Sequence, residues 1–207
     1  MPGRAIDISR DITISGVPVH QPRGRYLLVP VRTERPSLLG VALEALHGNR
    51  KVLPFRADPG GEYGAEVQRQ RAAQFGQSQT AAAMAAARAA GMPVGPAGQL
   101  PFTVRFRHRD IVGPSAGLIY ALAIEDMLST TDRAHGRVIA ATGEIDPTGA
   151  VSAVGYPNEK AESAGRGGAQ LFLVPHDPAG LAFGRGVPVE EVGSLQEALT
   201  HLATSSF

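Results

Sequence analysis

The chain has 207 residues, of which 43% are hydrophobic, enough to bury a core in one large domain or two small ones. Twenty basic and nineteen acidic residues leave a formal charge of +1, so no strong field favours nucleic acid or anionic lipid as a partner. The absence of cysteine excludes disulfides, thiolate zinc ligands and a cysteine nucleophile, and the six histidines lack metal-ligand spacing, so we expect no metal and no cofactor.

The first part of the chain predicts short strands and two helices. Apolar runs bounded by Gly and Pro predict strands at residues 11–15, 25–32 and 52–55. A helix is expected after Ser37, a residue suited to cap it, and before Gly48. The Ala- and Gln-rich segment 62–90 predicts a long helix that Gly91 ends.

Residues 92–98 contain two Pro and two Gly, a turn-forming composition that predicts a domain boundary. We therefore expect an N-terminal α/β region at residues 1–98 that packs on a second domain at residues 99–207. The second domain is expected to open with a strand at residues 100–106.

The second domain predicts a buried helix among further strands. Residues 115–129 are apolar on every side, which predicts a helix buried all round. Segments 138–142 and 150–154 flank the turn 146–149 and predict a hairpin. The remaining expected elements are a helix at 157–165, a strand at 171–174 and a last helix opened by a capping box from Ser194 to Glu197. This mixed order predicts an α/β or α+β sandwich, which we class as α+β.

A serine stands at the start of the predicted buried helix, in the pentapeptide Gly113-Pro114-Ser115-Ala116-Gly117. Small neighbours let another backbone approach closely, and the free N–H groups of a helix start suit a developing oxyanion. Two other interpretations stay open: Ser115 caps the helix, or the loop cradles a phosphate. The loop resembles that of the small-molecule kinases of the galactokinase and mevalonate kinase group, although their longer glycine run is missing.

Lysine is rare in this chain. Eighteen of the twenty basic residues are Arg, and the two lysines are Lys51 and Lys160. Arginine stays protonated in proteins, whereas a desolvated lysine can become a neutral amine that accepts a proton. Lowering a lysine pKa from ~10.4 to roughly 7 or 8 takes about 3 to 5 kcal/mol, which burial among apolar groups can supply.

Several separated blocks of the second domain resemble the proteolytic domain of Lon proteases. They are residues 113–117, residues 141–149, Val154-Gly155 followed by Asn158-Glu159-Lys160, and residues 171–175. Their order and spacing agree with the family along roughly residues 111–175. The resemblance implies a mixed sheet packed with helices, as in domain 2 of ribosomal protein S5.

The resemblance also implies a Ser-Lys dyad, carried onto Ser115 and Lys160, with Thr142 as the family's threonine near the lysine. Ala116 and Gly113 are expected to support the site, and the N–H groups of Ser115 and Ala116 are our candidates for the oxyanion hole. The chain departs from the family pattern after Gly155. Tyr156 stands where the family usually has a second glycine, and Asn158 replaces an additional lysine.

We therefore expect an ATP-independent serine endopeptidase that hydrolyses unfolded or extended polypeptides. No Gly-x-x-x-x-Gly-Lys-Ser/Thr motif is present to bind ATP. The chain before residue 98 more weakly resembles membrane-anchored bacterial Lon-like proteins, whose anchor and PDZ domain are not found here. The resemblance also implies a homo-oligomer, with the hexamer of the Lon family as the expected form.

Two other functions stay open, namely an inactive Lon-like binding or assembly protein and a kinase-like phosphate-binding protein. No leader peptide or membrane segment is evident, so we expect a cytoplasmic protein, or an extracytoplasmic, anchored one if a further segment precedes this chain.

Overall fold

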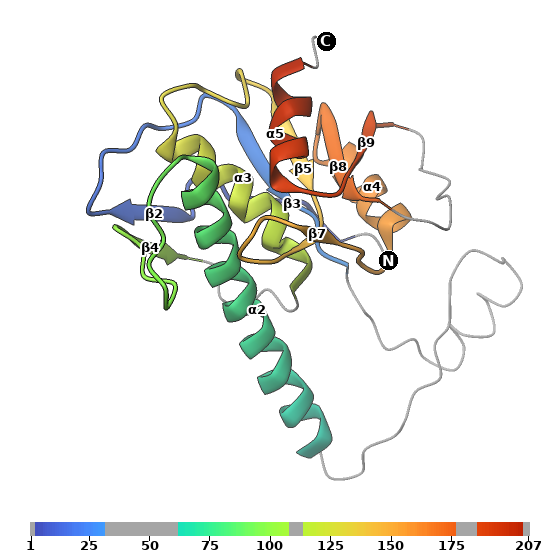
Figure 1. The fold of residues 1–207 in the computed structure, drawn as a ribbon. Coiled ribbons are helices and arrows are strands. Elements are labelled where there is room, and N and C mark those ends of the chain that lie inside the picture. Colours follow the sequence, from blue (N-terminus) through green and yellow to red (C-terminus); the bar gives the residue numbers. More distant parts are fainter. Residues whose placement is uncertain (1–2, 32–61, 108–113, 177–185, 205–207) are drawn as a thin grey trace, which may run out of the picture.

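The computed structural model describes residues 3–31, 62–107, 114–176 and 186–204 (Figure 1). The predicted helix after Ser37 and the predicted strand at 52–55 lie outside these residues. Gly113 lies outside them as well.

A mixed sheet forms the middle layer of the molecule, with five strands in the described residues. In spatial order they are β1 (Ile6–Asp7), β3 (Arg25–Leu28), β5 (Val138–Ala141), β8 (Leu171–Pro175) and β9 (Val189–Val192). β1 runs antiparallel to β3, and all other neighbours are parallel. The predicted strands at 25–32 and 171–174 are confirmed, the first of them shorter than expected. β1 and β9 were not predicted, because one has two residues and the other carries two glutamates.

Alternate residues of the central strands face two separate apolar layers. In β5, Ile139 and Ala141 belong to the larger core, whereas Ala140 between them packs with Phe172 in the smaller one. Side chains of a strand point alternately to opposite faces, so a strand covered on both sides must be apolar throughout. This accounts for the uninterrupted apolar sequence of β5 and β8.

Helices cover both faces of the sheet (Figure 1). The larger core lies under α2 (Glu62–Ala89), α3 (Gly117–Leu128) and α5 (Leu195–Thr204). α4 (Pro157–Arg166) packs on the opposite face through Ala161 and Ala164. The expectation of an α+β fold with a mixed sheet packed between helices is confirmed.

Helix α3 is buried along its whole length, as its sequence predicted. All twelve of its residues are buried, because the sheet, α2 and α5 surround it. Its last turns contain two buried acidic side chains that accept hydrogen bonds from other parts of the protein. The Arg133 guanidinium donates to Glu125, and the Tyr26 hydroxyl donates to Asp126 over 2.6 Å. Burial raises the pKa of Tyr26, which the Asp126 carboxylate raises further.

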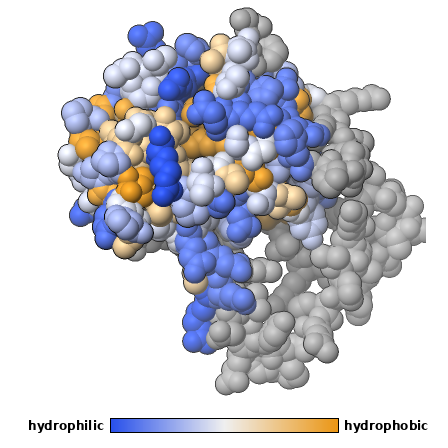
Figure 2. Space-filling view, in the orientation of Figure 1, coloured by the Kyte–Doolittle hydropathy of each residue, from blue (hydrophilic) through white to orange (hydrophobic). Residues whose placement is uncertain are grey.

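The long helix α2 confirms the prediction for residues 62–90 and its end at Gly91. The N–H of Met92 donates to Ala87 and that of Gly91 to Arg88, with Gly91 at φ 72°, which together form a Schellman motif. The opposite end of α2 extends from the body in Figure 1, and the part of it that Figure 2 colours is hydrophilic. In the described residues, no helix combines the length and apolar character needed to cross a membrane.

The helices predicted at 157–165 and after the capping box at Ser194 are both confirmed. α4 covers the predicted segment 157–165. α5 begins at its predicted capping box, where the Glu197 N–H donates to Ser194 Oγ over 3.1 Å and the Glu197 carboxylate accepts from the Gly193 N–H over 2.7 Å.

The predicted hairpin is wrong in its first strand. Residues 138–141 form β5, which pairs with β3 and β8 in the large sheet. The hairpin is instead made by β6 (Glu144–Ile145) and β7 (Val151–Ser152). β5 is buried on both faces and needs strand neighbours on each side, so only the residues beyond Gly143 remain free to pair across the turn.

Strands from before and after the predicted boundary at residues 92–98 pair with each other. β2 (Ile12–Ser15) is antiparallel to β4 (Thr103–Phe106), which also confirms the strands predicted at 11–15 and 100–106. β1 and β3 lie in the same sheet as β5, β8 and β9. The division of the chain at residue 98 stays a prediction.

Candidate active site

Ser115 lies in a short 3-10 turn, Pro114–Ala116, that leads directly into α3. Ala116, and not Ser115, occupies the N-cap position of α3, and Ser115 is half-buried. The interpretation of Ser115 as a helix cap is therefore wrong. Its position inside the turn leaves the hydroxyl available for another role.

The backbone of this turn is held by the segment that follows β5. The carbonyl oxygen of Ser115 accepts hydrogen bonds from the N–H of Gly143 over 2.9 Å and from Thr142 Oγ1 over 3.1 Å. The N–H of Leu118 donates back to the Gly143 carbonyl over 3.1 Å. Thr142 and Gly143 thus fix the turn that carries Ser115 at the carboxyl end of the central strand β5.

Lys160 approaches the carboxyl end of β5 from the opposite face of the sheet. It lies in the first part of α4 and is 4% exposed. Its Nζ donates to Thr142 Oγ1 over 2.9 Å. Side chains of a helix lean toward its N-terminus, so the amine lies near the start of α4. Thr142 therefore connects the amine of Lys160 with the backbone of Ser115.

Burial alone lowers the pKa of Lys160, to about 8. The cause is the loss of water around the ammonium, with no contribution from a neighbouring charge. Thr142 is only 1% exposed and supplies a neutral oxygen, so it does not offset this loss as a carboxylate would. A lysine in these surroundings is partly neutral near pH 7 and can take up a proton.

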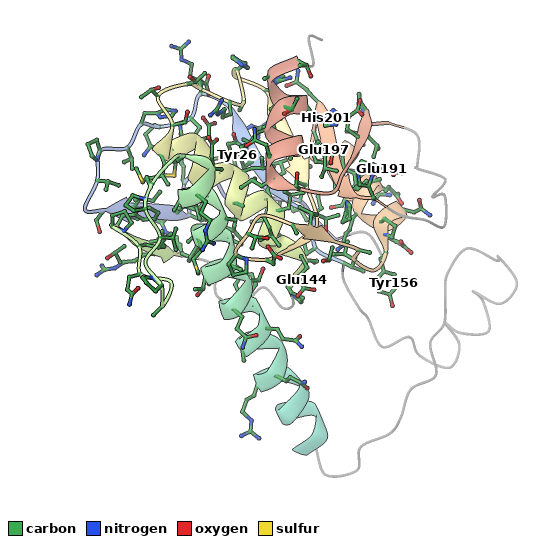
Figure 3. The ribbon with its side chains drawn as sticks, viewed as in Figure 1. Tyr26, Glu144, Tyr156, Glu191, Glu197 and His201 are labelled. Atoms are coloured by element: carbon green, nitrogen blue, oxygen red, sulfur yellow. The ribbon has the colours of Figure 1, made fainter. Side chains whose placement is uncertain are left out.

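Tyr156 is placed just before α4 in a backbone conformation that favours glycine. It has φ 61° and ψ 47° and is the N-cap residue of α4. Its carbonyl accepts the N–H of Lys160 over 3.2 Å, which closes the first turn of the helix. The side chain is 37% exposed, and Figure 3 shows it with Glu144 along the same edge of the molecule, pointing outward. Tyr156, which stands where the resembled family usually has a second glycine, therefore has a left-handed backbone in this chain.

The supporting residues are only partly placed by the structure. Ala116 is 5% exposed and lies directly after Ser115, whereas Gly113 is outside the described residues. One contact was missed from the sequence: Ser78 Oγ, from α2, donates to the Pro114 carbonyl over 2.9 Å. The sequence signal that could have indicated this contact was a serine on the side of the Ala-rich helix that packs against the core. In the described ranges, no group of three acidic or histidine side chains could hold a metal ion.

Comparison with known families agrees with this part of the chain. Residues 109–182 match the model of the Lon protease (S16) C-terminal proteolytic domain. The matched segment contains Ser115, Thr142 and Lys160. No individual curated protein matches the chain. The segment of residues 109–182 therefore belongs to the family of Lon proteolytic domains.

Proposed function

We propose that this protein is a serine peptidase in which Ser115 is the nucleophile and Lys160 its general base. The observation that carries the proposal is the buried amine of Lys160, joined through Thr142 to the backbone of Ser115. A serine hydroxyl is a weak nucleophile until a base takes its proton, and a neutral amine can do so. The family match to a proteolytic domain supports the same chemistry.

The reaction follows from these roles. The neutral amine of Lys160 takes the proton of the Ser115 hydroxyl while Oγ bonds to the carbonyl carbon of the peptide. The ammonium then returns the proton to the leaving nitrogen as the C–N bond breaks, which leaves an acyl group on Ser115. Water, deprotonated by the same amine, releases the acyl group and restores the hydroxyl.

The N–H groups of Ser115 and Ala116 are our candidates for stabilising the oxyanion. Both belong to the 3-10 turn, ahead of the regular hydrogen bonds of α3. The first N–H groups of a helix have no carbonyl partner within it, and they lie at the positive end of its dipole. A negative oxygen that forms beside Ser115 Oγ would meet these donors.

We further propose that hydrolysis needs no ATP and that the substrates are unfolded or extended polypeptides. The chain has no phosphate-binding Gly-x-x-x-x-Gly-Lys-Ser/Thr motif that could drive unfolding. An oligomer, as in the Lon family, is part of the same proposal, and sedimentation of the purified protein tests it.

Digestion of an unfolded protein such as casein tests the function. The wild type should cleave it at the same rate with and without ATP and magnesium, and Ser115→Ala should not cleave it. A rate that rises with ATP would contradict ATP independence. A wild type that cleaves nothing would favour the inactive binding or assembly protein, and ATP binding without cleavage would favour the kinase-like function.

A further inference from the structure

Helix α2 places one buried hydroxyl, that of Ser78, against the turn that carries Ser115. Ser78 is 5% exposed, and the neighbouring buried positions of α2 are Phe75, Ala82 and Ala85. Its Oγ donates to the Pro114 carbonyl over 2.9 Å, between segments 36 positions apart in the chain. Because a buried hydroxyl is costly without a hydrogen bond, this contact holds α2 and the turn together.

A second hydroxyl on α2 shows the more usual arrangement. Thr80 Oγ1 donates to the carbonyl of Gly76, four residues earlier in the same helix, over 3.1 Å, and it is exposed. Such local bonds are common for helical Ser and Thr and connect nothing beyond the helix. Ser78 differs because its partner is the residue immediately before the proposed nucleophile.

The bond from Ser78 fixes the peptide plane that precedes Ser115. A peptide unit is planar and trans, so the Pro114 carbonyl and the Ser115 N–H point in opposite directions within one rigid group. Holding that carbonyl toward α2 directs the Ser115 N–H away from α2. The next plane is held in the same way, because the Ser115 carbonyl accepts from Thr142 and Gly143.

Close packing prevents the turn from shifting relative to α2. A Cβ atom at Gly117 would lie 2.9 Å from Ser78 Oγ and 2.8 Å from Ile145 Cγ2, distances that side chains do not tolerate. The turn therefore sits against α2 on one side and β6 on the other. Small residues at this position let the hydroxyl of Ser78 reach the backbone.

We propose that Ser78 is a positioning residue, which aligns and polarises the Ser115 N–H as an oxyanion donor. This inference rests on the proposed peptidase function and assigns a role to a residue outside the matched segment 109–182. A hydrogen bond to the carbonyl of a peptide unit strengthens the N–H of that unit as a donor. Ser78 does not bond to Lys160, so it acts on the oxyanion and leaves the base unchanged.

The test compares Ser78→Ala with Thr80→Ala, a matched loss of a hydroxyl from the same helix. Losing an oxyanion donor outright lowers kcat by about 10²–10³, so losing its alignment should lower kcat about tenfold. KM for a peptide should stay within about twofold, because the ground-state carbonyl needs the donor less than the oxyanion does. The pH at half-maximal rate should stay near the wild-type value. Thr80→Ala should match the wild type in kcat, KM and pH profile.

A third variant keeps the inference testable if Ser78→Ala does not fold. Ser78→Cys keeps a side chain of similar size with a weaker donor, and we expect about a threefold lower kcat. A folded Ser78→Ala enzyme with wild-type kcat would overturn the inference and leave the proposed peptidase intact. If Ser78→Ala does not fold, wild-type kcat in Ser78→Cys would overturn it instead. A wild type without peptidase activity would remove both the proposed function and this inference.

Discussion

Replacing Lys160 with arginine distinguishes two roles for this residue, that of a base that accepts a proton and that of a permanent positive charge. The amine is 4% exposed and bonds to Thr142 Oγ1 over 2.9 Å. Arginine keeps the positive charge and the ability to donate, but it does not lose its proton in proteins. Lys160→Arg should therefore have no measurable peptide hydrolysis at any value from about pH 6 to about pH 10.

The structure sets the size and pH dependence of the effect. Burial lowers the pKa of Lys160 to about 8, against ~10.4 for an ordinary lysine. The difference corresponds to about 3 kcal/mol and leaves about a tenth of the amine neutral at pH 7, compared with roughly four parts in ten thousand for an ordinary lysine. The wild-type rate should rise with pH and level off above the lowered pKa.

Initial rates of peptide hydrolysis across this pH range provide the assay, with melting temperatures to show that the variant folds. A general base contributes about 10²–10⁴ in rate, so an active Lys160→Arg enzyme within about tenfold of wild type would refute the reasoning. A wild-type rate that rises only near pH 10 would show that the amine is not perturbed.

Three other substitutions test stability as well as activity. Lys160→Met should raise the free energy of unfolding at pH 7 by up to about 3 kcal/mol, because it removes a buried ammonium. The pKa of Lys160 is lower in the folded than in the unfolded protein, so the gain in stability should shrink between about pH 8 and about pH 10.4. Urea denaturation across this pH range measures the change. Ser115→Ala should abolish turnover yet change the free energy of unfolding by less than about 0.5 kcal/mol, because Ser115 is not a helix cap; a loss of about 1 kcal/mol in the same measurement would restore the cap interpretation. Tyr156→Gly should be about 1 kcal/mol more stable than Tyr156→Ala, because φ is 61° at that position, and equal stabilities would argue against a left-handed backbone there.

Much of the fold was predictable from local patterns. α3 was recognised because it is apolar on every side, and all of its residues are buried. The Gly91 that ends α2 and the Ser194 that caps α5 act within a few residues of their partners, so the sequence alone indicated them. Ser115 was indicated by its small neighbours at a helix start, Lys160 by the rarity of lysine, and both by family resemblance. Lys160 is buried, as a lysine that loses its proton must be.

Long-range pairing could not be predicted in the same way. β5 pairs with β3, more than a hundred residues earlier in the chain, and this pairing removed it from the hairpin that its flanking turn suggested. The contact of Ser78 with Pro114 likewise depends on how α2 lies against the turn, which periodicity does not determine. The left-handed backbone of Tyr156 was unexpected because aromatic residues rarely adopt it.

The most direct test of the central claim is labelling with a serine-directed fluorophosphonate, with the modified residue located by mass spectrometry. The reagent should attach to Ser115, at a rate that rises with pH through the lowered pKa of Lys160, near 8. The Lys160→Arg protein should remain unlabelled under the same conditions. A wild type that is labelled at another serine, or not at all, would contradict the assignment of Ser115 as a nucleophile activated by Lys160.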